Sequence, residues 1–164
     1  MVCSKQRGEH VMDEEMMRLA LAEAEKSGAD VPVGAVLCRD GQVIAVAHNQ
    51  REAGGGPFAH AEMLAMQRAF ERLGERRLRG CTLYVTLEPC PMCAGALIMA
   101  EAEACVFGAY DPRQGCCGSV YDLPQDPAFF HRVRCTGGLL EEQCAAQLQL
   151  FFQNKRKSSD FYYK

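Results

Sequence analysis

The feature that most constrains this chain is a pair of short motifs that lie thirty residues apart in the sequence. Cys90 and Cys93 stand in the run P-C-P-M-C, and His60 opens the run H-A-E. Proline is favoured at the first position of a helix, so Pro91 predicts a helix that begins between the two thiols. His60 is also expected at the start of a helix. The amino ends of two helices therefore become candidates for one shared site.

One histidine and two cysteines in C-x-x-C spacing are ligands that zinc accepts readily. A closed structural zinc site uses four protein ligands, whereas a catalytic site uses three and keeps one position open for water. Taken singly, Cys90 and Cys93 would fit a redox dithiol or two buried core thiols, and His60 would fit a hydrogen-bonded structural histidine. Taken together, with prolines beside the cysteines, the three residues predict one Zn²⁺ per chain.

Glu62 lies two residues after the histidine. Most glutamates are exposed on the surface of a helix, which is the alternative for Glu62. Its place beside a predicted ligand indicates instead a general acid and base that moves protons during the reaction. The combination of H-x-E with P-C-x-x-C resembles the signature of zinc-dependent nucleobase deaminases, which attack C6 of adenine or C4 of cytosine.

The length and composition are those of a soluble globular domain. The chain has 164 residues, of which 48% are hydrophobic and 24% charged, as in ordinary single domains. The longest apolar run, from Ala94 to Ala100, is too short to span a bilayer. The segment from Met1 to His10 has no apolar stretch of the kind found in signal peptides. We therefore expect a cytoplasmic protein without a membrane partner.

Ten cysteines raise the possibility of a disulfide scaffold. Several of them fall inside apolar segments, where a reduced cysteine behaves as a small hydrophobic residue. Cys116 and Cys117 are adjacent, and neighbours in sequence rarely reach disulfide geometry. The sequence favours reduced thiols.

The net charge of −3 argues against a protein that binds nucleic acid without specificity, because such proteins usually carry a strongly basic face. A compact RNA site remains open, since local clusters decide local fields. For each cluster taken singly, solvated surface charge is the alternative. The basic clusters are Arg72, Arg76, Arg77 and Arg79; Arg132 and Arg134; and Lys155, Arg156 and Lys157.

Strand-like and helix-like segments alternate along the chain, which predicts an α/β layered fold with a mainly parallel or mixed sheet. Asp40-Gly41 between two apolar runs is a strong hairpin signal, and Asp13 is a plausible N-cap for the first helix. We expect helices over Asp13–Lys26, about His60–Leu73, from near Pro91, and over roughly Glu141–Lys157. We expect strands over Val31–Cys38, Gln42–His48, Cys81–Thr86, Ala104–Gly108 and Val133–Thr136.

Beyond the zinc motif, most of the chain resembles the bacterial tRNA adenosine deaminases, which make inosine at the wobble position of the anticodon. The zinc motif is shared with the whole cytidine deaminase-like superfamily, whereas the segment from Phe107 to Arg156 is similar to the tRNA branch. The resemblance implies a cytidine deaminase-like three-layer α/β/α fold with a central mixed sheet of about five strands. It implies a single deaminase domain over residues 1–164, with a core over about 12–157, and a homodimer. The matching segments are Asn49, His60–Glu62, Cys90–Ala96, Phe107–Ala109, Gly118–Ser119 and Glu142–Phe152.

The same resemblance implies roles for individual residues. Asn49 would hydrogen-bond the target base, and Val33 and Ala61 would line its pocket. Asp111 and Arg113 would approach the flanking nucleotides, while Phe152 and Arg156 would hold the anticodon stem-loop. The residues alone leave other roles open, because an asparagine after a strand is usually a turn residue. Phenylalanines such as Phe152 usually lie in the core, and Arg113 and Arg156 would also fit ordinary surface charge.

Three departures from the family pattern concern the RNA footprint and the dimer surface rather than the zinc chemistry. Ala100–Glu103 replaces a segment that is typically basic, and Gly54–Gly56 with Phe58 replaces a more polar approach to His60. Arg113 stands where lysine is common, which keeps the charge and changes its geometry.

The function that the sequence favours is zinc-dependent hydrolytic deamination of adenosine to inosine at the wobble position of a tRNA. The alternatives are a deaminase of a free base or nucleoside of the guanine or cytosine type, a non-catalytic zinc-containing tRNA-binding subunit, and a structural zinc module. Glu62 argues against the second, and three ligands argue against the third.

Overall fold

A single five-stranded mixed sheet forms the centre of the protein, in the order β2-β1-β3-β4-β5. The computed structural model describes the backbone of residues 4–160 and the side chains of residues 11–157. β1 pairs antiparallel with β2 and β3, whereas β3, β4 and β5 run parallel. The mixed sheet of about five strands is thereby confirmed. The strands are β1 (Gly34–Arg39), β2 (Gln42–His48), β3 (Cys81–Leu87), β4 (Ala104–Ala109) and β5 (Arg134–Thr136).

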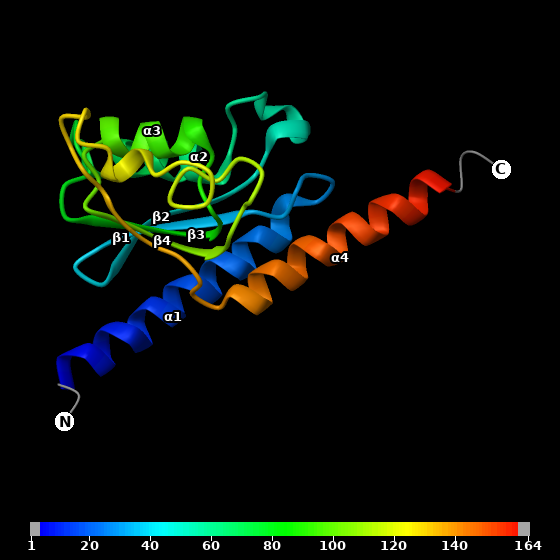
Figure 1. The fold of residues 1–164 in the computed structure, drawn as a ribbon, viewed down its shortest axis with the longest axis horizontal. Helices are drawn as coiled ribbons and strands as arrows, with labels where there is room; N and C mark the ends of the chain where they lie inside the picture. The colour runs from blue at the N-terminus through cyan, green and yellow to red at the C-terminus, as the bar shows by residue number, and fades with distance from the viewer. Residues whose placement is uncertain (1–3, 161–164) are drawn as a thin grey trace.

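Helices cover both faces of the sheet. α2 (Ala61–Leu73) and α3 (Pro91–Met99) lie on one face, and α1 (Ser4–Ala24) and α4 (Glu141–Asp160) lie side by side on the other (Figure 1). The three-layer α/β/α architecture expected from the sequence is confirmed. Three short helical turns connect these elements: η1 (Glu25–Ser27), η2 (Arg51–Gly55) and η3 (Leu123–Gln125).

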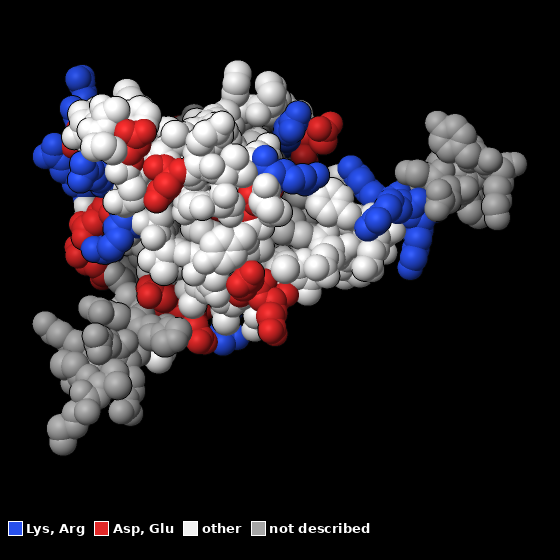
Figure 2. Space-filling model, in the orientation of Figure 1, with Lys and Arg blue, Asp and Glu red and all other residues white. Residues whose placement is uncertain are grey.

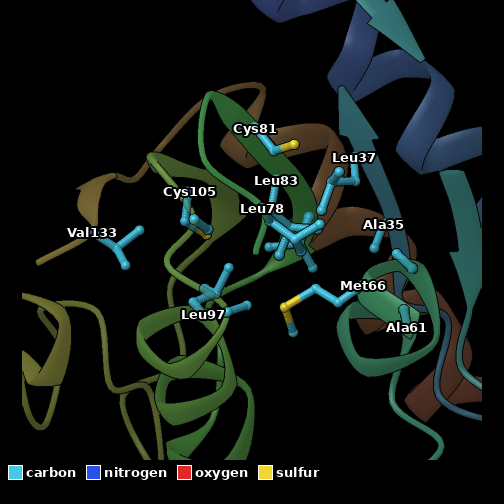
Figure 3. Packing of buried hydrophobic residues seen from close by; sticks show 14 of the residues in the cluster. Ala35, Leu37, Ala61, Met66, Leu78, Cys81, Leu83, Leu97, Cys105 and Val133 are labelled. Carbon is cyan, nitrogen blue, oxygen red and sulfur yellow. The ribbon is translucent and has the colours of Figure 1, made fainter. Parts of the chain in front are cut away.

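The larger hydrophobic core lies between the sheet and the pair α2 and α3. Leu37 and Leu83 of the sheet face Met66 of α2 and Leu97 of α3 (Figure 3). A smaller core around Met17 packs α1 and α4 against the opposite face. Burial on both faces explains why the central strands are continuous apolar runs rather than alternating ones.

Two glycines of the sheet allow the helices on the α1 and α4 side to approach closely. A Cβ at Gly34 would lie 1.9 Å from the carbonyl oxygen of Ala20 in α1. A Cβ at Gly108 of β4 would lie 2.2 Å from Sγ of Cys144 in α4. Both helices therefore rest on sheet backbone where no side chain intervenes.

The hairpin prediction is confirmed, since β1 and β2 are joined by Asp40 and Gly41 alone, with φ of 51° and 74°. Positive φ at both central residues is the requirement of the tight turn that Asp-Gly favours. β1 begins three residues later than expected. Val31 and Val33 precede it in a turn, where the Val33 amide donates to the Val31 carbonyl at 2.9 Å.

The predicted N-cap at Asp13 is wrong. α1 begins at Ser4, so Asp13 lies inside the helix, and its carboxylate accepts a hydrogen bond from the Tyr84 hydroxyl at 2.5 Å. Because a polar residue with a tertiary partner is tolerated within a helix, it does not mark a boundary.

Two further expectations concern the whole chain. In the part of the chain that the structure describes, no helix is long and apolar enough to cross a membrane. The nine cysteines of the described part are free thiols, as expected for a reduced protein.

Candidate active site

The predicted zinc ligands meet at the amino ends of α2 and α3. His60 is the N-cap of α2, Cys90 is the N-cap of α3, and Cys93 lies in the first turn of α3 after Pro91. Nδ1 of His60 is 3.6 Å from Sγ of Cys90 and 3.6 Å from Sγ of Cys93. Three such atoms within 4.8 Å of one another fit the borderline-soft donor set that zinc prefers.

The pKa values of the two thiols are shifted in opposite directions. A hydrogen bond from Cys93 and a second from His60 lower the pKa of Cys90 to about 4, whereas donating that bond raises the pKa of Cys93. The hydrogen bond with Cys90 also raises the pKa of His60. Metal binding would favour the deprotonated thiols, because zinc takes thiolates rather than thiols.

Glu62 is the second residue of α2 and is only 4% exposed. The alternative of an exposed surface glutamate is therefore wrong. Burial raises the pKa of Glu62 above its ordinary value. A carboxyl group whose pKa is raised holds its proton more readily than an exposed one, which suits general acid and base chemistry.

A pocket of about 180 Å³ opens beside this cluster. Four of the residues expected to bind substrate line it together with His60, Glu62 and Cys90: Val33, Asn49, Ala61 and Asp111. Asn49 is buried; its Nδ2 donates to the Val31 carbonyl at 3.1 Å, and its Oδ1 has no protein partner. A buried acceptor without a partner is costly, so it favours a ligand that donates a hydrogen bond.

The other three expected residues lie at a neighbouring hollow. Arg113, Phe152 and Arg156 border it together with Lys155, which also lines the 180 Å³ pocket. Phe152 is 38% exposed, so it does not belong to the core. Lys and Arg side chains gather at the far end of α4 (Figure 2). A basic and aromatic surface therefore continues from the pocket along the last helix.

Sequence reasoning missed several residues that line the pocket. Lys155 is one turn after Phe151 on α4, with its ammonium 5.1 Å from the centre of that ring. It was expected only as part of a basic cluster, although the spacing from Phe151 could have marked a shared face. The further lining residues that were missed are Asp30, Val31, Arg51, Glu52, Leu87, Glu88 and Gln114.

Asp30 explains how the wall formed by η2 is held in place. Its buried carboxylate accepts hydrogen bonds from the amides of Glu52 at 2.7 Å and Ala53 at 3.1 Å. The glycines after them adopt positive φ, 100° at Gly54 and 78° at Gly56. The glycine-rich departure from the family pattern thus lets the chain turn sharply beside the pocket.

The acidic departure at Ala100–Glu103 has a structural explanation. The Glu101 carboxylate binds the guanidinium groups of Arg77 and Arg79, and Arg72 donates to the Ile44 carbonyl at 2.8 Å. Three arginines of the cluster over residues 72–79 are therefore engaged within the protein.

Residues 10–109 match the family described as the cytidine and deoxycytidylate deaminase zinc-binding region. The tRNA-specific adenosine deaminase of Bacillus subtilis is 49% identical over 147 residues, which cover 88% of this chain and 91% of that protein. This chain belongs to the tRNA-specific adenosine deaminase family. Zinc is the cofactor of the matching domain, and the resemblance noted in the sequence is confirmed.

Two further relatives agree with this assignment. The tRNA-specific adenosine deaminase of Aquifex aeolicus is 41% identical and covers 88% of this chain and 97% of its own. A solved structure from work on A-to-I editing by tRNA:A34 deaminases at the wobble position of transfer RNA is 41% identical. It superposes with a TM-score of 0.78 and covers 81% of this chain and 98% of that one. The likeness extends well beyond the zinc motif, because the motif region ends at residue 109.

Proposed function

We propose that this protein hydrolyses adenosine to inosine, with release of ammonia, at the wobble position of a tRNA anticodon loop. The observation that carries the proposal is one pocket in which Glu62 lies beside the cluster of His60, Cys90 and Cys93, with the basic last helix at its edge. The identity of 49% to a tRNA-specific adenosine deaminase supports the RNA substrate.

In this proposal His60, Cys90 and Cys93 hold the zinc ion. Zinc bound there would act as a Lewis acid and would lower the pKa of bound water to about 7. Glu62 accepts a proton and passes it to the ring nitrogen beside the carbon that is attacked. It then takes a second proton from the oxygen added at that carbon and supplies it to the departing amine, which leaves as ammonia. The buried position of Glu62 supports both transfers, because its raised pKa makes it a competent donor as well as an acceptor.

The protein's own groups select and orient the base. The free Oδ1 of Asn49 accepts a hydrogen bond from the purine edge, while Val33 and Ala61 contact its flat face. A pocket of about 180 Å³ admits a single base, so a loop nucleotide has to be turned out of its stack to enter. Asp111, Arg113, Phe152 and Arg156 hold the nucleotides on either side.

Incubating the purified protein with total tRNA, and separately with free bases and nucleosides, tests the substrate class. The expected result is inosine in tRNA and released ammonia, with neither product from a Glu62→Ala variant. Product from guanine, cytosine or a nucleoside alone would favour the small-molecule alternative. RNA binding without any product would favour the non-catalytic subunit.

We further propose that two copies associate through the α2 and α3 side of the molecule, and that the homodimer acts in the cytoplasm, where its tRNA substrate is found. A hollow between these helices is lined almost wholly by apolar side chains, among them Met63, Phe70 and Ala96. Phe58 and Met99 at its edge are 71% and 70% exposed. Apolar surface of this kind favours burial against a partner. Sedimentation of Met99→Glu should show a monomer where the wild type is a dimer.

A further inference from the structure

Glu88 is the most heavily hydrogen-bonded carboxylate in the part of the chain that the structure describes, and its role is not explained by zinc binding or by proton transfer. It follows β3 directly, two residues before Cys90, and is 2% exposed. Its carboxylate accepts bonds from the amides of Asp111, Cys117 and Ser119, each at 3.0 Å, and from the Ser119 hydroxyl. All four donors belong to one segment, Asp111–Ser119, which we call the recognition loop.

The backbone around Glu88 bonds to the end of β4 and to the recognition loop. Its amide donates to the Ala109 carbonyl at 2.9 Å, and the Cys116 amide donates to the Pro89 carbonyl at 2.9 Å. The recognition loop is therefore attached directly to the turn that presents Cys90. The Glu88 side chain accepts four hydrogen bonds from the recognition loop and the neighbouring backbone accepts one, so the side chain contributes the larger part of this attachment.

Through Asp111, the hydrogen bonds of Glu88 also fix the backbone of the residues that face the substrate. The Asp111 carboxylate, fixed through its own amide, accepts bonds from the amides of Arg113 at 3.0 Å and Gln114 at 3.4 Å. Asp111 and Gln114 line the pocket, and Arg113 borders the neighbouring hollow. One buried carboxylate thus fixes the backbone positions from which three substrate-facing side chains extend.

Gly115 shows how closely the loop fits around this carboxylate. A Cβ at Gly115 would lie 2.3 Å from Oε2 of Glu88 and 2.6 Å from the Asp111 carbonyl oxygen. No side chain larger than hydrogen fits there without displacing either the carboxylate or the loop. The contact can therefore be disturbed from two sides, by changing Glu88 or by adding a methyl group at Gly115.

We propose that Glu88 is the positioning residue that fixes the recognition loop for binding of the nucleotides around the target adenosine. Glu88 lines the pocket, but both of its carboxylate oxygens accept hydrogen bonds from the loop, so it acts through Asp111, Arg113 and Gln114. The proposal rests on the proposed function, because it assigns the loop to substrate binding at that site. It separates Glu88 from Glu62, which belongs to the proton chemistry.

The decisive variant is Glu88→Gln. The NH2 group of the new glutamine is a hydrogen-bond donor and would face loop groups that are themselves donors. We expect KM for an anticodon stem-loop to rise about tenfold or more, with kcat within about threefold of wild type, because the loop holds the flanking nucleotides and the proton carrier Glu62 is unchanged. Zinc content should be unchanged. Gly115→Ala should reproduce the effect, and Ser119→Ala should give a smaller rise of about threefold, because it removes one donor of four.

Glu23→Gln is the matched control, since Glu23 is also a buried carboxylate with two partners, Lys26 and His48, and does not line the pocket. It should leave KM unchanged. Amide hydrogen exchange gives a readout that is independent of activity. In Glu88→Gln the amides of Asp111, Cys117 and Ser119 should exchange at least about tenfold faster, whereas Glu23→Gln should leave them at wild-type rates.

Several outcomes would overturn the proposal. A folded Glu88→Gln with faster exchange in the loop but unchanged KM would show that the loop's position does not matter for binding. Lost zinc and lowered kcat with unchanged KM would assign Glu88 to the ligand turn instead. If Glu88→Gln does not fold, Gly115→Ala and Ser119→Ala decide by the same criteria. A wild-type protein that does not deaminate the stem-loop would refute the proposed function, while exchange and stem-loop affinity would still test the positioning role.

Discussion

The floor and the rim of the pocket are built in different ways. The floor consists of His60, Glu62, Cys90 and Cys93, which lie at the amino ends of two helices; Glu62 and Cys93 are buried, and His60 and Cys90 are half-buried. The rim combines η2, the recognition loop and the last turns of α4, which are far apart in the sequence and mostly exposed. Under the proposed function, the reaction depends on short local motifs, whereas the choice of substrate depends on tertiary contacts.

The largest effect should follow from removing the metal at the floor. We expect one zinc per chain by elemental analysis of wild type and none after chelation or in Cys93→Ser, because two ligands and a water do not retain the ion at ordinary concentrations. Deamination should fall below detection and return when zinc is added to the chelated wild type. Full activity in metal-free protein would contradict a shared zinc centre.

Changing Glu62 should have the next largest effect. Glu62→Ala should retain zinc and the fold but lose a factor on the order of 10² to 10⁴ in kcat, because two proton transfers lose their carrier. Glu75→Ala, at a carboxylate that does not line the pocket and has 47% of its side chain exposed, is the control and should stay near wild type. Loss of zinc in Glu62→Ala would make this residue a ligand rather than a proton carrier.

Removal of the rim's helical part should affect binding more than chemistry. Truncation after Leu150 removes Phe152, Lys155 and Arg156, so KM for the stem-loop should rise about tenfold because stacking and positive charge are removed. Affinity should also become less sensitive to salt. The magnitude of the slope of log affinity against log salt concentration should decrease by about 1 to 2, since each phosphate that the helix no longer neutralises reduces it by about one unit. Zinc content should not change. Unaltered deamination of tRNA would remove α4 from the rim.

The smallest effect should come from a buried carboxylate outside both regions. Burial alone would raise the pKa of Glu23, but hydrogen bonds from Lys26 and His48 outweigh it and hold the pKa below 4.5. The stability that the ionised Glu23 contributes is therefore present above pH 4.5 and lost as the pH falls through the lowered pKa. Urea unfolding should show Glu23→Gln less stable at neutral pH by on the order of 0.5 kcal/mol. The two proteins should converge in acid, and a difference that persists at the lowest pH would disprove the linkage.

The same contrast explains what could be predicted from the sequence. The floor was predicted because Pro91, the C-x-x-C spacing and the adjacent Glu62 encode their geometry within a few residues. The hairpin at Asp40-Gly41 was predicted for the same reason, since positive φ is a property of those two residues. The strands and helices of the three layers follow from apolar runs and their periods.

Predictions were wrong or incomplete where the role of a residue depends on a contact with a residue distant in the sequence. Asp13 lies inside α1, and its carboxylate is bound by Tyr84, 71 residues away, rather than by the amides of a helix start. Glu88 reads as an ordinary residue of the motif, and only the fold shows that it binds a loop 23 to 31 residues later. Lys155 reaches the pocket because α4 crosses the molecule, which no local pattern encodes.

The glycine at position 108 has a consequence at the other end of α4. The helix rests on Gly108 through Cys144, and Lys155 lies eleven residues further along, or about 16 Å at 1.5 Å per residue. A methyl group under Cys144 that tilted the helix by about 5° would swing the lysine ammonium by about 1.4 Å, comparable to the misplacement that disturbs an active site. A small tilt of α4 at its contact with the sheet is thus amplified at Lys155. A substitution at Gly108, far from the pocket, would therefore change which nucleotide sequence fits beside it.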